Sequence, residues 1–342
     1  MKLKNVLVAT VASSALVLAG CSAGGGGEEK APGADGETTA TSLMLNWYPY
    51  GEHAPFYYGV QEGIFAEHGI DLTITAGQGS TKTAQAAGSN QTDFGWADTA
   101  AVMSNIDKGV KVKSLGVFLQ TTPSAVQVYA DGPIQTTADL AGKTIAVSAG
   151  DAPTTTFPIF LDRVGVPEDQ VQQQSLDSAG KIAAMLSGQV DGLIGFAHDQ
   201  GPNIANKSGR EMRYLRYSDE GLNFYSNGLI ANTSTIERSP ELVQAMVDAT
   251  RESFEAAIAN PEAAVASMVG KDPQTPPESV LLQQWQETIP LLTTENTEGM
   301  APGVNSDEDW ANTISILSDA GLTETGAEAS TYWDSSFTSN EE

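Results

Sequence analysis

Aromatic and ionisable side chains gather in short segments that follow expected β-strands. The rings belong to Trp47, Tyr48, Tyr50, Trp96 and Phe196, and the polar groups near them to His53, Asp98, Asp151 and Asp199. Ring stacking selects flat partners, and a few polar groups fix their orientation. The pattern predicts a binding site for a small planar organic molecule.

Each of these side chains also has a structural interpretation. The three clustered aromatics at positions 47, 48 and 50 could pack in a core or at an interface. His53 could satisfy the start of the helix that follows it, and Asp98 and Asp199 could cap helices. Because one carboxylate can both cap a helix and contact a ligand, the two interpretations stay open.

Two glycine-containing segments could supply backbone donors to the same site. They are Gly79-Ser80-Thr81 and Gly150-Asp151, each of which is expected to open a helix. The first N–H groups of a helix have no partner within it, so they suit a hydrogen-bond acceptor or an anion.

Charge and metal-ligand chemistry exclude several classes of protein. The 342 residues include 17 Lys+Arg and 43 Asp+Glu, a net charge of −26, which disfavours nucleic-acid binding. Cys21 is the only cysteine and forms neither an internal disulfide nor a Cys-based zinc site. His53, His68 and His198 have no metal-ligand spacing.

Catalytic motifs are weak. The chain has no Gly-x-Ser-x-Gly segment, and Gly142-Lys143-Thr144 lacks the earlier glycine of a phosphate-binding loop. His198 and Asp199 could support acid–base chemistry near a carbonyl. We nevertheless expect a binding protein with no cofactor and no catalytic residues.

Short β-type runs alternate with helical ones, which predicts an α/β protein with largely parallel sheets. Strands are expected at 43–45, 70–75, 92–96, 110–118, 125–130, 144–147 and 192–196. Helices are expected at 55–61, 154–164, 181–186, 240–259, 261–269, 276–288 and 306–320, with Ser239 and Ser306 as N-caps.

Two segments about 100 residues apart follow one plan. Residues 88–98 and 188–199 each contain a helix-ending glycine, an aspartate in a turn, a short strand with glycine, and then an aromatic residue, alanine and aspartate. This similarity predicts two lobes of like construction, each presenting a strand end with a ring and a carboxylate.

The simplest chain path leaves the first lobe near Ala130 and returns near positions 226–232, so that two crossing segments form a hinge. The expected divisions are a first lobe at 43–130, a second lobe at 131–228, and a return with C-terminal helices at 229–342. The ligand would lie between the lobes, and the protein would act as a monomer.

The N-terminus resembles a secretion signal. Lys2 and Lys4 precede an apolar run at 6–18 that is too short to cross a bilayer. The following Leu18-Ala19-Gly20-Cys21 resembles the lipobox of bacterial lipoproteins. We expect residues 1–20 to be removed, Cys21 to be lipidated, and residues 21–42 to be a flexible linker to the extracytoplasmic face of the membrane.

Longer motifs carry a family resemblance. They are residues 45–59 (LNWYPYGEHAPFYYG), 62–65 (EGIF), 69–72 (GIDL), Gly79-Ser80, 93–95 (DFG), 121–123 (TTP), 139–145 (DLAGKTI) and Asp191-Gly192. Together they resemble the type II periplasmic-binding-protein superfamily, in its NMT1/THI5-like branch for thiamine-pyrimidine precursors, nitrate, sulfonate and taurine.

That resemblance implies a two-lobed solute-binding protein that passes its ligand to an ABC importer permease. Thiamine-precursor binders usually carry Trp, Pro, Asn and His in the first loop. Trp47, Pro49 and His53 match, but Tyr50 replaces the Asn, so an aromatic carboxylate would also suit the site. Taurine, alkanesulfonate or nitrate would need fewer rings. A few family members are Cys-rich pyrimidine synthases, a pattern from which this chain departs.

Overall fold

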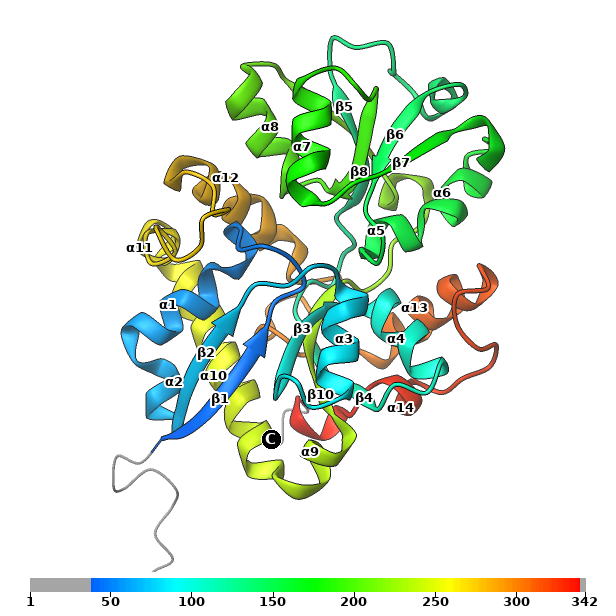
Figure 1. Ribbon diagram of the computed structural model, residues 1–342. Coiled ribbons are helices and arrows are strands. Elements are labelled where there is room, and N and C mark those ends of the chain that lie inside the picture. The colour runs from blue at the N-terminus through cyan, green and yellow to red at the C-terminus, as the bar shows by residue number, and fades with distance from the viewer. Residues whose placement is uncertain (1–37, 339–342) are drawn as a thin grey trace, which may run out of the picture.

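Two five-stranded mixed sheets form the framework of the molecule, one in each lobe (Figure 1). The computed structural model describes residues 38–338. The first sheet has the order β2 (Ile70–Thr75), β1 (Thr39–Met44), β3 (Phe94–Asp98), β10 (Asn227–Asn232) and β4 (Val112–Val117). The second has the order β7 (Gln172–Ser175), β6 (Thr144–Val147), β8 (Gly192–Phe196), β5 (Ser124–Tyr129) and β9 (Met212–Arg216).

The two sheets share one pairing scheme. In the first, β1 is parallel to β2 and β3, and β10 is antiparallel to β3 and β4. In the second, β6 is parallel to β7 and β8, and β5 is antiparallel to β8 and β9. The central strands β3 and β8 are the two segments whose sequences follow one plan.

The likeness extends to the aspartate that precedes each central strand. The carboxylate of Asp93 accepts the Ser42 N–H at 2.8 Å, and that of Asp191 accepts the Thr144 N–H at 2.9 Å. Each aspartate thus joins the central strand of its sheet to the neighbouring parallel strand.

Helices cover the faces of both sheets. Those of the first lobe before the crossing are α1 (Ala54–Glu62), α2 (Ile64–Glu67), α3 (Ser80–Gly88) and α4 (Thr99–Asp107). The second lobe contains α5 (Ala152–Thr155), α6 (Phe157–Arg163), α7 (Ser178–Leu186) and α8 (Gln200–Ser208). The C-terminal block contains α9 (Thr233–Arg238), α10 (Pro240–Ala259), α11 (Pro261–Ala266), α12 (Glu278–Thr288), α13 (Asp307–Asp319) and α14 (Ala329–Tyr332).

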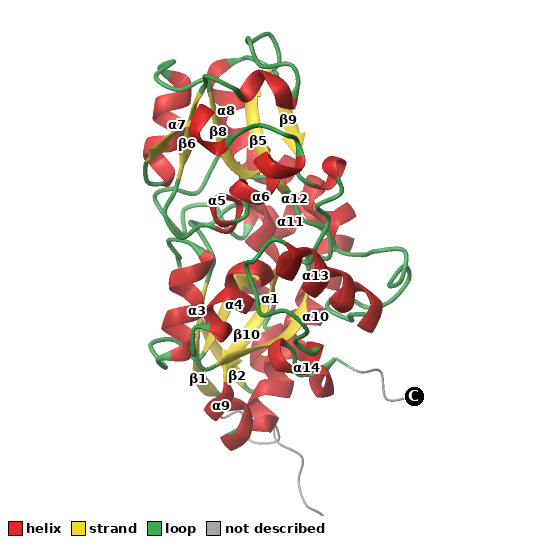
Figure 2. Cartoon of the chain, turned by 90° about the vertical axis from the view of Figure 1, so that its right-hand side faces the viewer, coloured by secondary structure: helices red, strands yellow, loops and turns green. Residues whose placement is uncertain are grey.

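The C-terminal helices lack a sheet of their own and complete the core of the first lobe. Phe254 of α10 and Trp285 of α12 lie in one buried cluster with Phe56 of α1 and Leu43 of β1. A second cluster joins Trp310 of α13 to Phe160 of α6. Figure 2 shows α13 beside the junction between the lobes.

The crossing segments lie elsewhere than the expected hinge near Ala130. Strand β5 (Ser124–Tyr129) pairs within the second sheet, so the chain leaves the first lobe between Val117 and Ser124. All of β10 (Asn227–Asn232) belongs to the first sheet, so the return is complete before position 227. The expected boundary at 130 was therefore wrong, because a strand's composition does not reveal the sheet in which it pairs, whereas the expected return at 226–232 coincides with β10.

The single helix expected at 154–164 is two helices. Helix α5 ends at Thr155, and α6 begins at Phe157 with proline in its first turn. Pro158 has no N–H to donate to the preceding turn, which ends the first helix. Of the two expected N-caps, Ser306 accepts the Asp309 N–H at 3.0 Å, whereas Ser239 makes no side-chain cap hydrogen bond.

The elements that the sequence did not predict are mostly polar. Strands β7 and β9 are the two edges of the second sheet and lack a clear alternation of apolar residues. Helix α8 was also missed. Strand β1 begins at Thr39, inside the segment expected to be a linker, because its first two residues are exposed and carry no hydrophobic signal.

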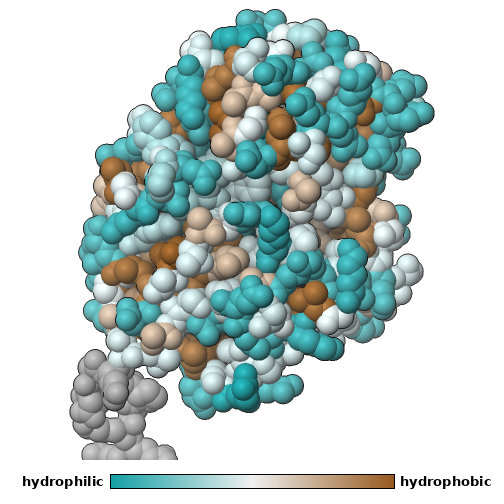
Figure 3. Space-filling model, in the orientation of Figure 1, coloured by the Kyte–Doolittle hydropathy of each residue, from teal (hydrophilic) through white to brown (hydrophobic). Residues whose placement is uncertain are grey.

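Within residues 38–338, no helix is long and apolar enough to cross a membrane. On the face drawn in Figure 3, hydrophobic and hydrophilic residues are interspersed. The expected signal peptide at 1–20, Cys21 and linker positions 22–37 lie outside the described residues.

Candidate functional site

A cavity lies between the lobes, at the carboxyl ends of strands from both sheets. The space between its walls, open solvent included, is about 300 Å³. Its walls are Asn46, Trp47, Tyr50, Gly79 and Ser80 from the first lobe, and Asp151, Ala152, Pro153, Gly195, Phe196, Asp199 and Gln200 from the second. Such strand ends are the usual ligand position in open α/β sheets.

The rings of the two lobes meet at this cavity. Trp47, Tyr48 and Tyr50 form one buried cluster with Ala152 and Phe196. The Trp47 side chain is only 8% exposed, and its indole N–H has no acceptor among residues 38–338. A ligand that separates the rings would therefore meet apolar faces on both sides and one unused donor.

Seven of the predicted site residues line the cavity: Trp47, Tyr50, Gly79, Ser80, Asp151, Phe196 and Asp199. Tyr48 lies just behind it, and its hydroxyl donates to Asp199 Oδ1 at 2.6 Å. Two of the seven carry carboxylates, so hydrogen-bond acceptors flank the rings.

With Tyr48, five predicted site residues do not line the cavity, and the other four are Trp96, Asp98, His53 and Thr81. Trp96 is fully buried in the first lobe's core, with its ring centroid 5.0 Å from that of Phe56. Asp98 caps α4 by accepting the Ala100 N–H at 2.9 Å, and His53 is fully buried beneath Tyr50. Thr81 lies beside the cavity, where its N–H donates to Gly150 O at 3.3 Å.

The backbone donors expected for an anion are largely occupied by the protein itself. The N–H of Gly79 donates to Asn46 O at 2.8 Å, and that of Asp151 donates to Ser148 O at 3.3 Å. Gly79 has a φ of 115°, and a Cβ there would lie 2.7 Å from Gly150 O. Glycine is required here for close approach of the two lobes.

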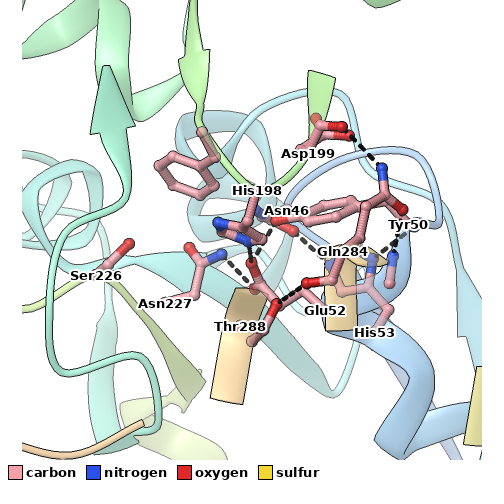
Figure 4. A network of polar contacts seen from close by, with 12 residues as sticks. Asn46, Tyr50, Glu52, His53, His198, Asp199, Ser226, Asn227, Gln284 and Thr288 are labelled. Atoms are coloured by element: carbon pink, nitrogen blue, oxygen red, sulfur yellow. Dashed lines mark hydrogen bonds and ion pairs between the residues drawn. The ribbon is translucent and has the colours of Figure 1, made fainter. Parts of the chain in front are cut away.

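Glu52, which sequence reasoning did not single out, is the centre of a buried polar network (Figure 4). Its Oε1 accepts from Trp96 Nε1 and Asn227 Nδ2, each at 2.6 Å. Its Oε2 accepts from the Tyr50 hydroxyl and lies 2.9 Å from His198 Nε2. Because His198 belongs to the second lobe, this fully buried contact ties the lobes together.

The donors around Glu52 keep it ionised. Burial alone would raise the pKa of Glu52, but the hydrogen bond and charge of His198, together with His53 and Tyr50, lower it to about 2. This carboxylate is therefore a fixed negative charge in the first lobe, and His198 is its partner from the second.

The pKa of Asp199 is shifted in the opposite direction from that of Glu52. Burial raises the pKa of Asp199 to about 7, although the hydrogen bond from Tyr48 opposes the shift. Its backbone carbonyl accepts from Gln284 Nε2 at 2.8 Å, and Gln284 Oε1 accepts the Gly51 N–H at 2.9 Å. Helix α12 thus holds both the first-lobe loop and the start of α8.

Asp151 is paired with a buried lysine. Lys181 Nζ lies 2.9 Å from Asp151 Oδ2 and 2.8 Å from Ile194 O, and it sits 5.3 Å from the centroid of the Trp47 ring. Since the lysine side chain is fully buried, its charge is used within the protein to hold Asp151 and Trp47.

The lobes are in direct contact around the cavity. Four hydrogen bonds described above cross between them: Glu52 to His198, Tyr48 to Asp199, Gln284 to Asp199, and Thr81 to Gly150. Trp47 also borders an outer cavity with about 1040 Å³ of empty space. A ligand that reaches the inner cavity from this side must separate the lobes.

Sequence reasoning missed several of these residues. Asn46, Gly195 and Gln200 line the cavity one position beyond predicted loops, and Ala152 and Pro153 lie within the loop expected at 148–153 but were not singled out. Glu52 could have been suspected as a lone carboxylate within an aromatic loop. Among residues 38–338, no group of His, Cys, Asp and Glu is arranged to hold a metal ion.

Comparison with known proteins agrees with this architecture. A formylaminopyrimidine-binding protein of Halalkalibacterium halodurans is 24% identical over 92% of this chain and 94% of its own. The riboflavin-binding protein RibY of Chloroflexus aurantiacus is 25% identical over 85% of this chain and 84% of its own. A Legionella pneumophila relative, 24% identical over 79% of this chain and 83% of its own, is named a 4-amino-5-hydroxymethyl-2-methylpyrimidine phosphate synthase.

Solved structures share the fold. The alkanesulfonate-binding protein SsuA of Xanthomonas axonopodis pv. citri, bound to MOPS, superposes with a TM-score of 0.65 at 14% identity, covering 87% of this chain and 99% of its own. The two lobes with a cavity between them define a type II periplasmic-binding-protein fold. The NMT1/THI5-like family model matches residues 51–264, more than half of the chain, and the protein belongs to this family.

Proposed function

We propose that this protein binds a small, flat nitrogen heterocycle between its lobes and delivers it to the permease of an ABC importer. The observation that carries the proposal is the composition of the inner cavity. Rings from both lobes stand beside the carboxyl groups of Asp151 and Asp199, and no Lys or Arg is among the described residues that line it. Rings favour a flat solute, and carboxylates favour one that donates hydrogen bonds.

The same composition disfavours anions. An aromatic carboxylate, an alkanesulfonate such as taurine, or nitrate would approach the carboxyl group of Asp199 and an Asp151 carboxylate whose positive partner is already paired with it. The backbone donors of Gly79 and Asp151 are already used, and the charge of Lys181 is directed to Asp151. The names of the two binding-protein relatives, for a pyrimidine and for riboflavin, support a heteroaromatic ligand.

Capture would couple ring stacking to lobe closure. A ligand favours the closed form only if it contacts both lobes, and Trp47 and Phe196 offer one ring from each. The closed protein would then present a single surface, formed by both lobes, to the permease. A monomer is sufficient for this mechanism.

A lipid anchor would keep the protein near its permease. We propose that Cys21 is lipidated after removal of residues 1–20, which would place the protein outside the cell on the membrane. Expression of the full chain and of Cys21→Ala, followed by fractionation, tests this proposal. We expect the wild-type protein in the membrane fraction and the variant released; an anchored variant would contradict lipidation at Cys21.

Ligand class can be tested by calorimetry and thermal shift on the chain from residue 22 onward. We expect 4-aminopyrimidine to bind and stabilise the protein, by ~2.7 kcal/mol at 100 times its dissociation constant. Benzoate, taurine and nitrate should have little effect. Stabilisation by taurine or nitrate alone would overturn the proposal, and turnover of a pyrimidine would favour an enzyme like the synthase relative.

A further inference from the structure

We propose that His53 is a positioning residue that fixes the side-chain amide of Asn46 with its nitrogen toward the cleft, so that the bound ligand presents a hydrogen-bond acceptor to Asn46. The choice of ligand rests on the proposed function. The orientation of the amide does not, because it follows from contacts within the first lobe.

The first contact fixes the tautomer of His53. The backbone N–H of Tyr50 lies 3.3 Å from His53 Nδ1, within the short turn in which the His53 N–H donates to Tyr50 O at 2.8 Å. A backbone N–H can only donate, so Nδ1 must accept and carries no proton. The neutral imidazole therefore has its proton on Nε2.

The second contact fixes Asn46. His53 Nε2 lies 2.8 Å from Asn46 Oδ1, so the imidazole donates and the amide oxygen accepts (Figure 4). Burial lowers the pKa of His53 to about 4, which keeps the ring neutral and this donor in place near neutral pH. The Asn46 amide oxygen is thereby turned away from the ligand.

The remaining atom of the amide is its nitrogen. The Tyr50 hydroxyl donates its proton to Glu52 Oε2, so toward Asn46 it can only accept. The Asn46 side chain opposes the rise that burial causes in the pKa of Tyr50, which agrees with an N–H on that side. An amide nitrogen has two protons, and the second remains for the cavity that Asn46 lines.

The consequence is a mixed recognition pattern. Asn46 offers a donor, whereas Asp199 on the other lobe offers acceptor capacity. A ring nitrogen or a carbonyl oxygen of the ligand would face Asn46, and an amino or ring N–H group would face the second lobe. A flat hydrocarbon of the same size would lack the first of these contacts.

The tautomer can be measured without a ligand. We expect long-range proton–nitrogen NMR spectra of the nitrogen-15-labelled protein to show His53 with its proton on Nε2 at neutral pH, with His53→Phe used for assignment. A proton on Nδ1 would overturn the proposal, because His53 would then accept from Asn46 and the amide oxygen would face the cleft.

Binding of two matched rings tests the consequence. 4-Aminopyrimidine and aniline have the same shape and amino group, but only the former has ring-nitrogen acceptors. We expect the ratio of their dissociation constants to favour 4-aminopyrimidine by roughly tenfold in the wild-type protein, about the worth of one hydrogen bond. His53→Phe, which keeps a ring against Tyr50, and Asn46→Asp, which replaces the amide donor by an acceptor, should reduce this ratio toward one.

His68→Phe is the matched control, because His68 is a partly exposed histidine on the first lobe whose side chain bonds to Glu252, away from the cavity lining. It should keep the wild-type ratio. A ratio that is unchanged in His53→Phe while both rings still bind would overturn the positioning role. If neither ring binds the wild-type protein, the proposed function fails, and the NMR measurement still decides the orientation at His53.

Discussion

The ends of the two central strands have nearly the same sequence plan and different uses. In the first lobe, β3 ends in Trp96 and Asp98, both fully buried away from the cavity. In the second lobe, Phe196 at the end of β8 and Asp199 just beyond it both line the cavity. The matching backbone therefore places similar residues at matching points, and their neighbours decide what they do.

The neighbours differ in a specific way. The first lobe has additional aromatic residues from the C-terminal helices, and Phe254 lies 5.6 Å from Trp96, centroid to centroid. In the first lobe, the loop that carries Trp47 and Tyr50 lines the cleft, and Trp96 is buried in the core. In the second lobe, the equivalent loop after β6 lines the cavity with Asp151, Ala152 and Pro153 and carries no aromatic ring there, and Phe196 itself faces the cavity. A repeated motif predicts position in the fold better than it predicts contact with a ligand.

The largest expected effect concerns stability. Trp96→Ala should lower the free energy of unfolding by about 3–5 kcal/mol, because it empties a fully buried site and removes a donor to Glu52. Phe196→Ala should cost clearly less, because one side of its ring already faces a cavity. Urea unfolding of both variants measures this difference; equal losses would mean that both strand ends serve the core alike.

For ligand binding, substitution of Phe196 should have a larger effect than substitution of Trp96. Phe196→Ala should weaken binding of 4-aminopyrimidine by about 1 kcal/mol, roughly fivefold, through loss of one stacking face. Trp96→Phe, which keeps a ring in the core, should bind the same probe with nearly wild-type affinity. Isothermal calorimetry gives both constants, and a stronger effect at position 96 would place the ligand against the first sheet.

Asp98 and Asp199 should make the free energy of unfolding fall as pH rises. Burial raises the pKa values of Asp98 and Asp199 to about 7 from an ordinary 3.8. Folding thus favours their neutral forms, and their contribution is present below about pH 3.8 and lost as pH rises through about 7. Asp199→Asn should remove its share of this slope in urea unfolding measured across that range, as should Asp98→Asn.

His53 and Glu52 have the opposite effect on the pH dependence of stability. The pKa values of His53 and Glu52 are lowered to about 4 and about 2, so their contributions are lost as pH falls through those values. A slope between about pH 4 and 7 that Asp199→Asn leaves unchanged would mean that Asp199 is ionised in the folded protein at neutral pH.

The smallest expected effect tests whether the aspartates before the two central strands have equivalent roles. Asp93→Ala and Asp191→Ala each remove an acceptor from a backbone N–H of the neighbouring parallel strand. Each should lower stability by about 1 kcal/mol, the net worth of one such hydrogen bond. Thermal unfolding should give similar shifts for the two variants, and a large difference would show that the two turns are not equivalent.

Much of the fold could be predicted because it depends on local signals. The strand at 70–75, the helix at 240–259 and the paired segments ending in Trp96 and Phe196 have clear apolar runs and terminators. The edge strands β7 and β9 have no such signal, since one or both of their faces meet water. The boundary near Ala130 was wrong because sheet membership depends on pairing between distant segments.

The residues that line the site could also be predicted in large part, but their hydrogen-bond partners could not. Loops at strand ends identified most of the cavity lining, including Trp47 and Phe196 from opposite lobes. The partners that give each group its role come from far along the chain. The Glu52 carboxylate is hydrogen-bonded to Asn227 and His198, and the Asp199 carbonyl accepts from Gln284. No spacing rule connects these positions.

Gln284 has a practical consequence for observing the molecule at work. It bonds to Gly51 on one side and to Asp199 on the other, and its neighbour in sequence is the buried indole of Trp285. Any movement that parts the lobes must break the second bond and disturb this helix. We therefore expect the emission of Trp285 to report on cleft opening without an attached dye, once the other four tryptophans are replaced by phenylalanine.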